Sequence, residues 1–256
     1  MILLGMPQLY EYDNIEDNLK LAKKLGLDFI ELNLNFGYCR KEMEQGTVKD
    51  LLNKYNLKAT LHFYDEADLA SYDEVVDAYL VLLERYCKLG SDYVDSMNIH
   101  LIPGPVVTIS GVKNYIYEKE YDEYISRFIK NLKRAEDICK KYNIRMVIEN
   151  TDSIPSFTSR VYKDLYNAGF KFCYDIGHDH LSYDIVANTI KEVPLEFQEF
   201  HFHDGLGRKK CHLTLGEGEI DLKKFKELAI KHNAYVNLEV KQASDLIKSV
   251  PYFKAL

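Results

Sequence analysis

The 256-residue chain lacks the features that mark membrane-spanning and disulfide-rich secreted proteins. No apolar run approaches the roughly 20 residues that a membrane-spanning helix needs. The first residues, Met1 to Gly5, contain neither a basic leader nor a long apolar stretch, so we expect no signal peptide. The five cysteines are far apart and form no CxxC pair, which argues against a zinc ribbon and a disulfide framework. These absences favour a protein of the reducing cytoplasm with no membrane partner.

Two further absences narrow the class of protein. Positive charge is not in excess, because 40 Asp and Glu against 33 Lys and Arg give a net charge of −7. Nucleic-acid-binding proteins usually need a basic face, so we do not expect a nucleic-acid partner. No GxGxxG turn follows an early strand, which leaves a doubly wound dinucleotide-binding sheet without support.

The chain does contain a regular alternation of short apolar runs and amphipathic segments. We expect eight strands, at residues 2–5, 28–33, 58–63, 93–101, 145–150, 171–175, 198–203 and 234–240. We expect eight helices, at residues 15–25, 46–55, 72–89, 118–142, 158–168, 183–191, 221–231 and 244–249, the last ending before Pro251. Asn14 and Asp221 are expected helix N-caps, and Gly26 is expected to end the first helix in a left-handed conformation.

Length agrees with this pattern. Dividing 256 residues by eight gives 32, about the length of one strand–helix unit. The sequence therefore predicts the α/β class and a single (β/α)8 TIM barrel, with one domain over residues 1–256.

Polar residues gather where the expected strands end. Six of them lie at or near the carboxyl ends of separate strands: His62, His100, Glu149, Asp175, His201 and Glu239. In a barrel these ends converge on one face, where the active site is built. A single strand-end histidine is more often a hydrogen-bonded structural residue than a ligand. Three carboxylates in one bowl, however, would repel each other and lose hydration unless a cation joined them.

We therefore expect one divalent metal ion, bound by most of Glu149, Asp175, His201 and Glu239. Three oxygen ligands and one nitrogen suit Mn²⁺, Co²⁺ or Mg²⁺, with Zn²⁺ as an alternative, rather than a thiolate metal. Four protein ligands leave two octahedral positions open, which two adjacent oxygens of a polyol could fill.

Two loops following strands carry further candidates. Asp175-Ile176-Gly177-His178 places His178 over the turn, near a substrate oxygen. His201 and His203 point to the same side of a strand, so both can face the bowl. The turn from Gly216 to Gly218 precedes a helix and is a candidate phosphate site, although Glu217 and Glu219 disfavour an anion there. The basic run from Arg208 to Lys210 is a better phosphate candidate, and a solvated loop is the alternative.

These motifs resemble the xylose-isomerase-like barrel superfamily of sugar-phosphate isomerases and epimerases, including the ketose 3-epimerases of tagatose and psicose type. The motifs that carry the resemblance run in family order between residues 145 and 240: Ile148-Glu149-Asn150, Asp175-Ile176-Gly177-His178, His201-Phe202-His203-Asp204, Leu215-Gly216-Glu217-Gly218 with Ile220-Asp221, and Leu238-Glu239. The resemblance implies an isomerase acting on a small sugar or sugar phosphate, and it implies a homodimer.

The resemblance also implies roles for individual residues. Glu149, Asp175, His201 and Glu239 would bind the metal. Glu149 and Glu239 would be the catalytic acids and bases on opposite faces of the carbon next to the ketone, with the cation stabilising the enediolate. Around them we expect substrate contacts from His62, His100, His178, His203, Arg208 and His212. Arg208 follows His201 by seven positions, and its alignment with the substrate arginine of the epimerases is not fixed.

Other functions share parts of this pattern. The endonuclease-IV-type apurinic endonucleases belong to the same superfamily and hold three zinc ions. Their Asp-x-His pair before the LGEG turn is Lys210-Cys211-His212 here, so one carboxylate is missing. A dehydratase of inosose type would share the metal site, and a non-catalytic sugar-binding or metal-binding barrel is a third class. The segment 102–118 is expected to be either a substrate-covering loop or a packed surface loop.

Overall fold

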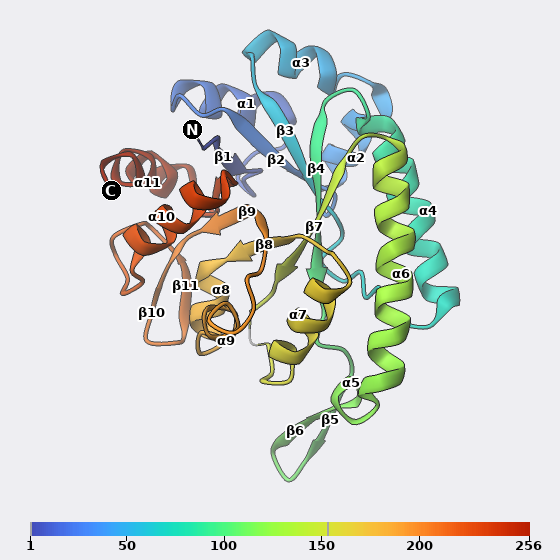
Figure 1. Ribbon diagram of the computed structural model, residues 1–256. Coiled ribbons are helices and arrows are strands. Elements are labelled where there is room, and N and C mark those ends of the chain that lie inside the picture. The colour runs from blue at the N-terminus through green and yellow to red at the C-terminus, as the bar shows by residue number, and fades with distance from the viewer. Residues whose placement is uncertain (1, 153) are drawn as a thin grey trace.

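The computed structural model describes residues 2–152 and 154–256 and contains a closed barrel of eight parallel strands (Figure 1). The barrel strands are β1 (Leu4–Pro7), β2 (Phe29–Asn33), β3 (Lys58–His62), β4 (Val94–Leu101), β7 (Arg145–Asn150), β8 (Phe172–Asp175), β9 (Phe197–Phe202) and β12 (Tyr235–Leu238). Each pairs with the next of these strands along the chain, and β12 closes the barrel on β1. The predicted α/β barrel is confirmed.

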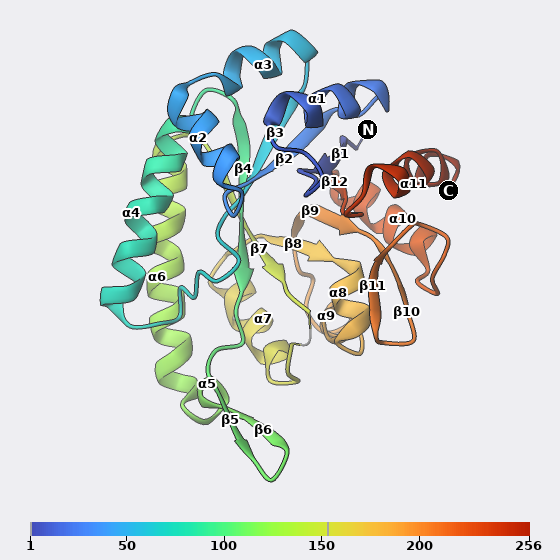
Figure 2. The same cartoon turned by 180° about the vertical axis from the view of Figure 1, so that it is seen from behind.

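Helices cover the outside of the barrel, and the long helices α4 and α6 pack side by side in both views (Figures 1 and 2). The helices that follow barrel strands include α1 (Ile15–Lys24), α3 (Val48–Tyr55), α4 (Asp73–Gly90), α6 (Tyr121–Lys141), α7 (Thr158–Asn167), α9 (Ile185–Thr189), α10 (Leu222–His232) and α11 (Ala243–Ala255). Three short helices were not expected: α2 (Gly37–Gln45), α5 (Ile116–Lys119) and α8 (Ile176–Leu181). No helix within the described residues is long and apolar enough to cross a membrane.

Local signals in the sequence explain where several helices begin and end. Asn14 Oδ1 accepts the Asp17 N–H at 2.8 Å, and Asp221 Oδ1 accepts the Lys224 N–H at 3.2 Å, so both expected N-caps are confirmed. Gly26 has φ +65°, the left-handed conformation expected after α1.

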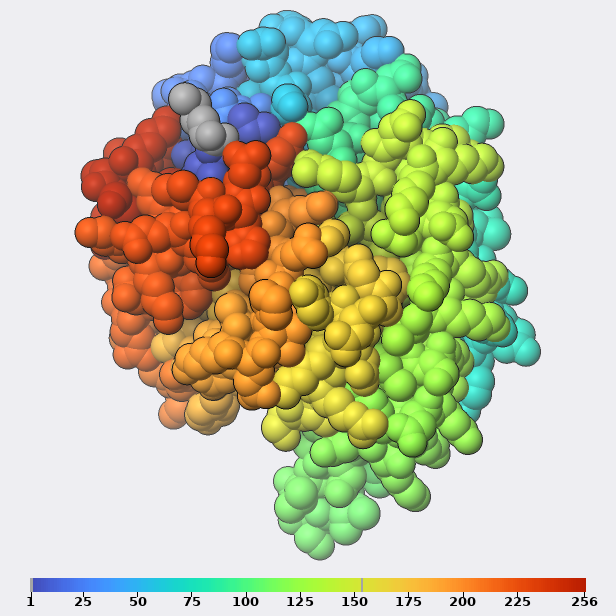
Figure 3. Space-filling view, in the orientation of Figure 1, coloured from blue at the N-terminus to red at the C-terminus, as the bar shows by residue number. Residues whose placement is uncertain are grey.

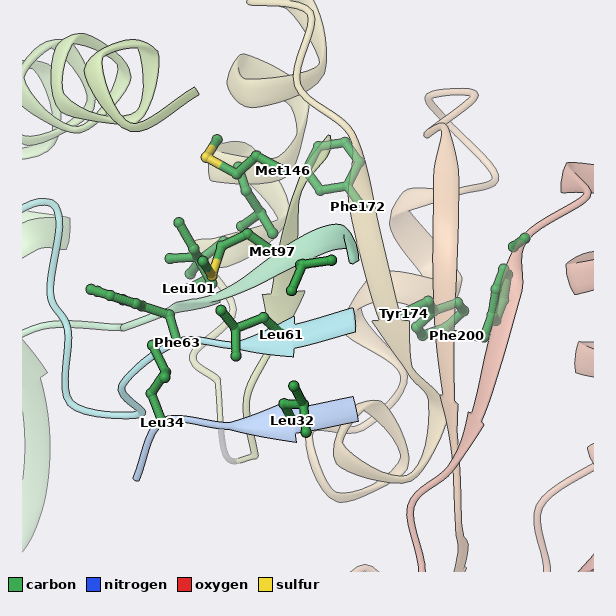
Figure 4. Packing of buried hydrophobic residues seen from close by; sticks show 14 of the residues in the cluster. Leu32, Leu34, Leu61, Phe63, Met97, Leu101, Met146, Phe172, Tyr174 and Phe200 are labelled. Carbon is green, nitrogen blue, oxygen red and sulfur yellow. The ribbon is translucent and has the colours of Figure 1, made fainter. Parts of the chain in front are cut away.

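The strands divide their two faces between apolar packing and polar chemistry. Alternate residues such as Leu61, Met97 and Phe200 belong to the buried apolar cluster, and Figure 4 shows apolar side chains of this cluster from several strands. The intervening residues are polar and meet across the barrel, because Thr60 of β3 and Ser96 of β4 both donate to Glu199 of β9. The short apolar runs in the sequence did not predict this polar barrel interior.

The segment expected to be a substrate-covering loop or a packed loop forms a projecting hairpin, and its covering role stays a prediction. Its strands are β5 (Val106–Ile109) and β6 (Val112–Tyr115), and Figure 3 shows it extending from the body of the molecule. Ile109 and Val112 at its tip are 61% and 63% exposed, so this segment is not a packed surface loop. A second hairpin, β10 (Asp204–Leu206) and β11 (Lys210–Leu213), lies beside the barrel mouth.

The prediction that the last helix ends before Pro251 was wrong, because α11 continues through that residue. Proline removes one backbone hydrogen bond from a helix interior. Val250 and Phe253 are buried on either side of it, and their packing supports the continued helix. The extra turns bring the Tyr252 ring against Gly216, where a Cβ would meet the ring at 2.5 Å.

Candidate metal centre and active site

Four neighbouring strands bring the four expected metal ligands together. Glu149 lies on β7, Asp175 on β8 and His201 on β9, while Glu239 follows β12 directly. All four are buried, and one ligand atom from each lies within 4.8 Å of the others. The strand-end pattern in the sequence thus corresponds to one cluster at the barrel mouth.

The contacts in this cluster fit a cation better than a hydrogen-bond network. His201 Nδ1 lies 2.9 Å from Glu149 Oε1 and 3.0 Å from Glu239 Oε2. Within the described residues, His201 Nδ1 and Glu239 Oε2 have no hydrogen-bond partner although both are buried. Buried polar atoms are normally paired, so lone-pair atoms that converge without donors are typical of metal ligands.

Electrostatics in the cluster keep the carboxylates charged. Burial raises the pKa of Glu149, but the facing His201 and His62 outweigh burial and hold this pKa well below its ordinary value. For Glu239, burial is likewise outweighed by Lys241 and His201, so its pKa is also lowered. Burial lowers the pKa of His201, yet the surrounding acidic groups raise it well above 6.5. In the absence of a cation, protons on the His201 and His62 imidazoles balance the negative charge of these carboxylates.

His62 and His100 form a second group beside Glu149. The two Nε2 atoms are 3.1 Å apart, and they lie 3.4 and 3.7 Å from Glu149 Oε2. His62 Nδ1 lies 2.8 Å from the Phe63 carbonyl oxygen, which only accepts hydrogen bonds, so Nδ1 carries a proton. Burial lowers the pKa of His62, but Glu149 and Glu31 raise it to about 10. A proton or a cation must therefore lie between Nε2 of His62 and its acidic neighbour.

His178 and His212 form a similar pair on the other side of the cluster. Their Nε2 atoms are 3.4 Å apart, and their Nδ1 atoms face the carbonyl oxygens of Asn150 at 3.4 Å and Glu239 at 3.0 Å. The carbonyls favour a proton on each Nδ1. Burial lowers the pKa of His178, but Asp175 and Glu239 raise it, so a proton on His178 Nε2 can face the lone pair of His212 Nε2. The pKa of His212 is lowered to about 3, by burial and by the neighbouring His203. This pair can accept a donor or a cation between its rings.

His203, which was expected to contact the substrate, contacts the carboxylate of Asp175. Its Nδ1 faces the His212 N–H at 2.8 Å, and its Nε2 lies 3.0 Å from Asp175 Oδ1. Protein groups therefore engage both ring nitrogens, and the ring is fully buried. Gly177 leaves room for this ring, because a Cβ there would meet His203 Cε1 at 1.9 Å. In this arrangement His203 orients the carboxylate of Asp175, a candidate metal ligand.

Backbone N–H groups of the Gly216–Gly218 turn surround an anion, but this anion is the side chain of Asp204. Buried Asp204 accepts the N–H groups of Gly205, Gly216 and Gly218 at 2.9 Å and that of Ile220 at 3.2 Å. A Cβ at Gly218 would meet Asp204 Oδ1 at 2.2 Å. The hypothesis that this turn binds phosphate was wrong, because Asp204 already uses its donors.

Arg208 is placed at the tip of the β10–β11 hairpin. Its guanidinium bonds the His180 carbonyl oxygen and lies 2.6 Å from Asp184 Oδ2. Neither contact involves the four central residues, so the structure does not bring Arg208 into their cluster. Its expected role in substrate binding stays a prediction.

Three residues around the centre were missed by the sequence analysis. Asn98 Nδ2 donates to Glu149 Oε2, Asn150 Nδ2 donates to the Asp175 carbonyl oxygen at 2.7 Å, and Lys241 Nζ pairs with Glu239 Oε1. One of these has a signal in the sequence. Asn98 is two positions before His100 on β4, and residues i and i+2 of a strand share one face, whereas Lys241 follows Glu239 by two positions beyond the end of β12.

Comparisons with known proteins agree with the fold. The family model described as "Xylose isomerase-like TIM barrel" matches residues 19–255, and the chain belongs to that family. An uncharacterized protein of Methanocaldococcus jannaschii is 27% identical over 242 residues, which cover 90% of this chain and 88% of the relative.

Several solved structures share the whole fold. A D-tagatose 3-epimerase-like protein has a TM-score of 0.77 at 18% identity, covering 99% of this chain and 96% of its own. The 3-keto-D-glucoside 4-epimerase of E. coli has a TM-score of 0.75 at 14% identity, covering both chains in full. The IolI protein, solved with a bound zinc atom, has a TM-score of 0.74 at 14% identity, covering 99% and 97%. At these identities the likeness shows the fold alone.

Proposed function

We propose that the protein is a metal-dependent sugar isomerase or epimerase that acts on a ketose, free or phosphorylated. The observation that carries the proposal is the convergence of Glu149 and Glu239 on His201 Nδ1, at 2.9 and 3.0 Å. The names of the structural neighbours, which include a D-psicose 3-epimerase in the presence of D-fructose, support the substrate class.

The arrangement suits proton transfer at a carbon next to a carbonyl. A divalent cation held by Glu149, Asp175, His201 and Glu239 would supply positive charge where the substrate oxygens become negative. Glu149 and Glu239 come from β7 and β12, which are separated by β8 and β9, so they can reach a bound ketose from two sides. One carboxylate would remove the proton from the carbon, and the other would return a proton to the opposite face. This exchange inverts the carbon without net oxidation.

Deuterium exchange tests the proposal directly. The protein loaded with Mn²⁺ or Co²⁺ is incubated with a panel of ketohexoses and their phosphates in deuterated water. We expect an epimerised product that carries deuterium at the inverted carbon. Failure to incorporate deuterium across the whole panel would contradict the proposal, and loss of water from the substrate would instead indicate the dehydratase.

The two histidine pairs favour a second candidate function, a metal-dependent phosphodiesterase of endonuclease type. His62 and His100 share Glu149 as a third ligand candidate, so a second cation has a complete group to bind. The group of His178, His203 and His212 is weaker, because His203 is engaged by Asp175 and Lys210 replaces the expected carboxylate.

Metal stoichiometry separates the two functions. After loading with excess metal and desalting, mass spectrometry counts the ions per chain. One ion per chain supports the isomerase, whereas three zinc ions with cleavage of an abasic DNA duplex would replace it by the phosphodiesterase. His62→Ala should remove a second ion while leaving the central ion, which identifies the group that holds each one.

A further inference from the structure

A second layer of buried carboxylates lies inside the barrel beneath His201. Glu31 of β2 and Glu199 of β9 are 2% and 1% exposed, and both face the Nε2 side of the His201 ring. The candidate metal ligands Glu149 and Glu239 face its Nδ1 side. The imidazole therefore separates two acidic layers, and only the upper one belongs to the centre described above.

The two lower carboxylates differ in what their oxygens already contact. Glu199 Oε2 accepts the Ser96 hydroxyl at 3.0 Å, and Glu199 Oε1 accepts the Thr60 hydroxyl at 3.4 Å. Glu199 Oε1 is also 3.8 Å from His201 Nε2, beyond hydrogen-bond distance. The hydrogen bonds of Glu199 are thus satisfied without His201.

One carboxylate oxygen of Glu31 has no hydrogen-bond donor among the described residues. Its Oε2 accepts the Asn237 amide at 2.7 Å, which fixes the carboxylate in place. Its Oε1 lies 3.3 Å from His201 Nε2, and within the described residues neither of these two buried atoms has a hydrogen-bond partner. Phe29, two positions before Glu31 on the same strand, is fully buried beneath this layer. Glu31 Oε1 is therefore the acceptor that the geometry offers to a proton on His201 Nε2.

We propose that Glu31 is a positioning residue, whose carboxylate receives the Nε2–H of His201 and fixes the ring with Nδ1 toward the candidate metal centre. A metal-bound imidazole keeps the proton on its other nitrogen, and in a dry interior that proton needs an acceptor. Asn237, Glu31 and His201 then form one chain of contacts from β12 through β2 to β9. The inference rests on the metal centre of the proposed function, but not on the sugar or on the reaction.

Metal affinity tests this role with a matched pair of variants in the full-length protein. Glu31→Gln and Glu199→Gln each neutralise one buried carboxylate of the same layer. We expect Glu31→Gln to weaken Mn²⁺ binding roughly 10- to 100-fold by calorimetry, as loss of such a supporting acceptor does elsewhere. Glu199→Gln should weaken the affinity less than Glu31→Gln, because Glu199 Oε1 is beyond hydrogen-bond distance of His201 Nε2 and both Glu199 oxygens already accept hydroxyl groups. Equal affinities in the two variants would overturn the inference.

A measurement on the wild-type protein covers the case in which Glu31→Gln does not fold. Protein labelled with ¹⁵N-histidine is loaded with Zn²⁺, and the His201 signals are assigned by their loss in His201→Gln. We expect a protonated Nε2 and a metal-shifted Nδ1, whereas a metal-shifted Nε2 would overturn the inference. A wild-type protein that binds no metal would overturn both this inference and the metal centre. Absence of sugar turnover would count only against the proposed function.

Discussion

Two buried carboxylates at the same end of the barrel, Asp204 and Glu239, have opposite surroundings. Asp204 is 1% exposed and accepts four backbone N–H groups from the turn around Gly216. Glu239 is 8% exposed, and its Oε2 has no hydrogen-bond donor among the described residues, although it lies 3.0 Å from His201 Nδ1. In the amino-acid sequence the two residues look alike, because each is an acid that follows a barrel strand.

The difference separates a structural acid from a functional one. Backbone N–H groups that surround a carboxylate stabilise its charge permanently and leave it no capacity for another ligand. A carboxylate that faces an imidazole and another carboxylate, Glu149, is stable only when protons or a cation balance the cluster. Substitutions at Asp204 should therefore act mainly on stability, and substitutions at Glu239 mainly on chemistry.

The largest effect is expected from Glu239→Gln. Loss of a positioned acid–base group should lower turnover by roughly 10²- to 10⁴-fold, measured as deuterium incorporation into the ketose that the wild type epimerises. The free energy of unfolding of the metal-free protein should fall by less than in an Asp204 variant, because Glu239 loses the Lys241 and His201 interactions that lower its pKa but leaves no set of backbone N–H donors unpaired. The exposed Glu217→Gln is the matched control and should keep full turnover. An active Glu239→Gln variant would remove Glu239 from the base role.

Asp204→Asn should give the reverse result. The amide places an NH₂ group among backbone donors, so we expect a loss of about 2–4 kcal/mol in the free energy of unfolding, measured with urea. The central ion should still bind, because Asp204 contacts none of the four ligands in the hydrogen-bond pattern. If metal affinity fell while stability did not, the division between the two carboxylates would be wrong.

The sequence predicted the barrel and the four central residues for a simple physical reason. Period-two strands and period-3.6 helices are local patterns, and the parallel barrel then brings the strand ends together. Nothing local distinguishes Asp204 from Glu239, because the four donors of Asp204 come from residues 205–220 folding back over it. Glu31 was missed for a related reason. Its partners Asn237 and His201 are more than 160 positions away along the chain.

Metal affinity should depend on pH, and the protonation of His201 sets the direction of the change. Acidic neighbours raise the pKa of His201 above 6.5 in the metal-free protein, so a cation must displace a proton at neutral pH. Affinity should therefore rise with pH, by about tenfold per unit for one displaced proton. Calorimetry in buffers of different ionisation enthalpy counts the protons released.

The same shift affects the stability of the metal-free protein. A histidine pKa that is raised in the folded state stabilises the fold fully below the unfolded pKa, and the stabilisation is lost as the pH rises through the folded pKa. The metal-loaded protein should not show this loss, because the cation replaces the proton. A metal affinity that is independent of pH between 6 and 8 would contradict the protonated His201.

The smallest effect on metal affinity is expected from substitution of Lys241, whose side chain pairs with Glu239 and not with Asp204. Its Nζ contacts Glu239 Oε1 and its side chain is half exposed, so solvent screens the interaction. Lys241→Met removes a positive charge that competes with a cation for Glu239. We expect Mn²⁺ affinity to rise by about 1.5- to 5-fold at low salt, the range that exposed ion pairs supply, and by less at high salt. Lys248→Met, an exposed lysine beside Glu217, is the control and should leave affinity unchanged. A fall in Mn²⁺ affinity in Lys241→Met would show instead that the lysine holds Glu239 in the geometry that binds the ion.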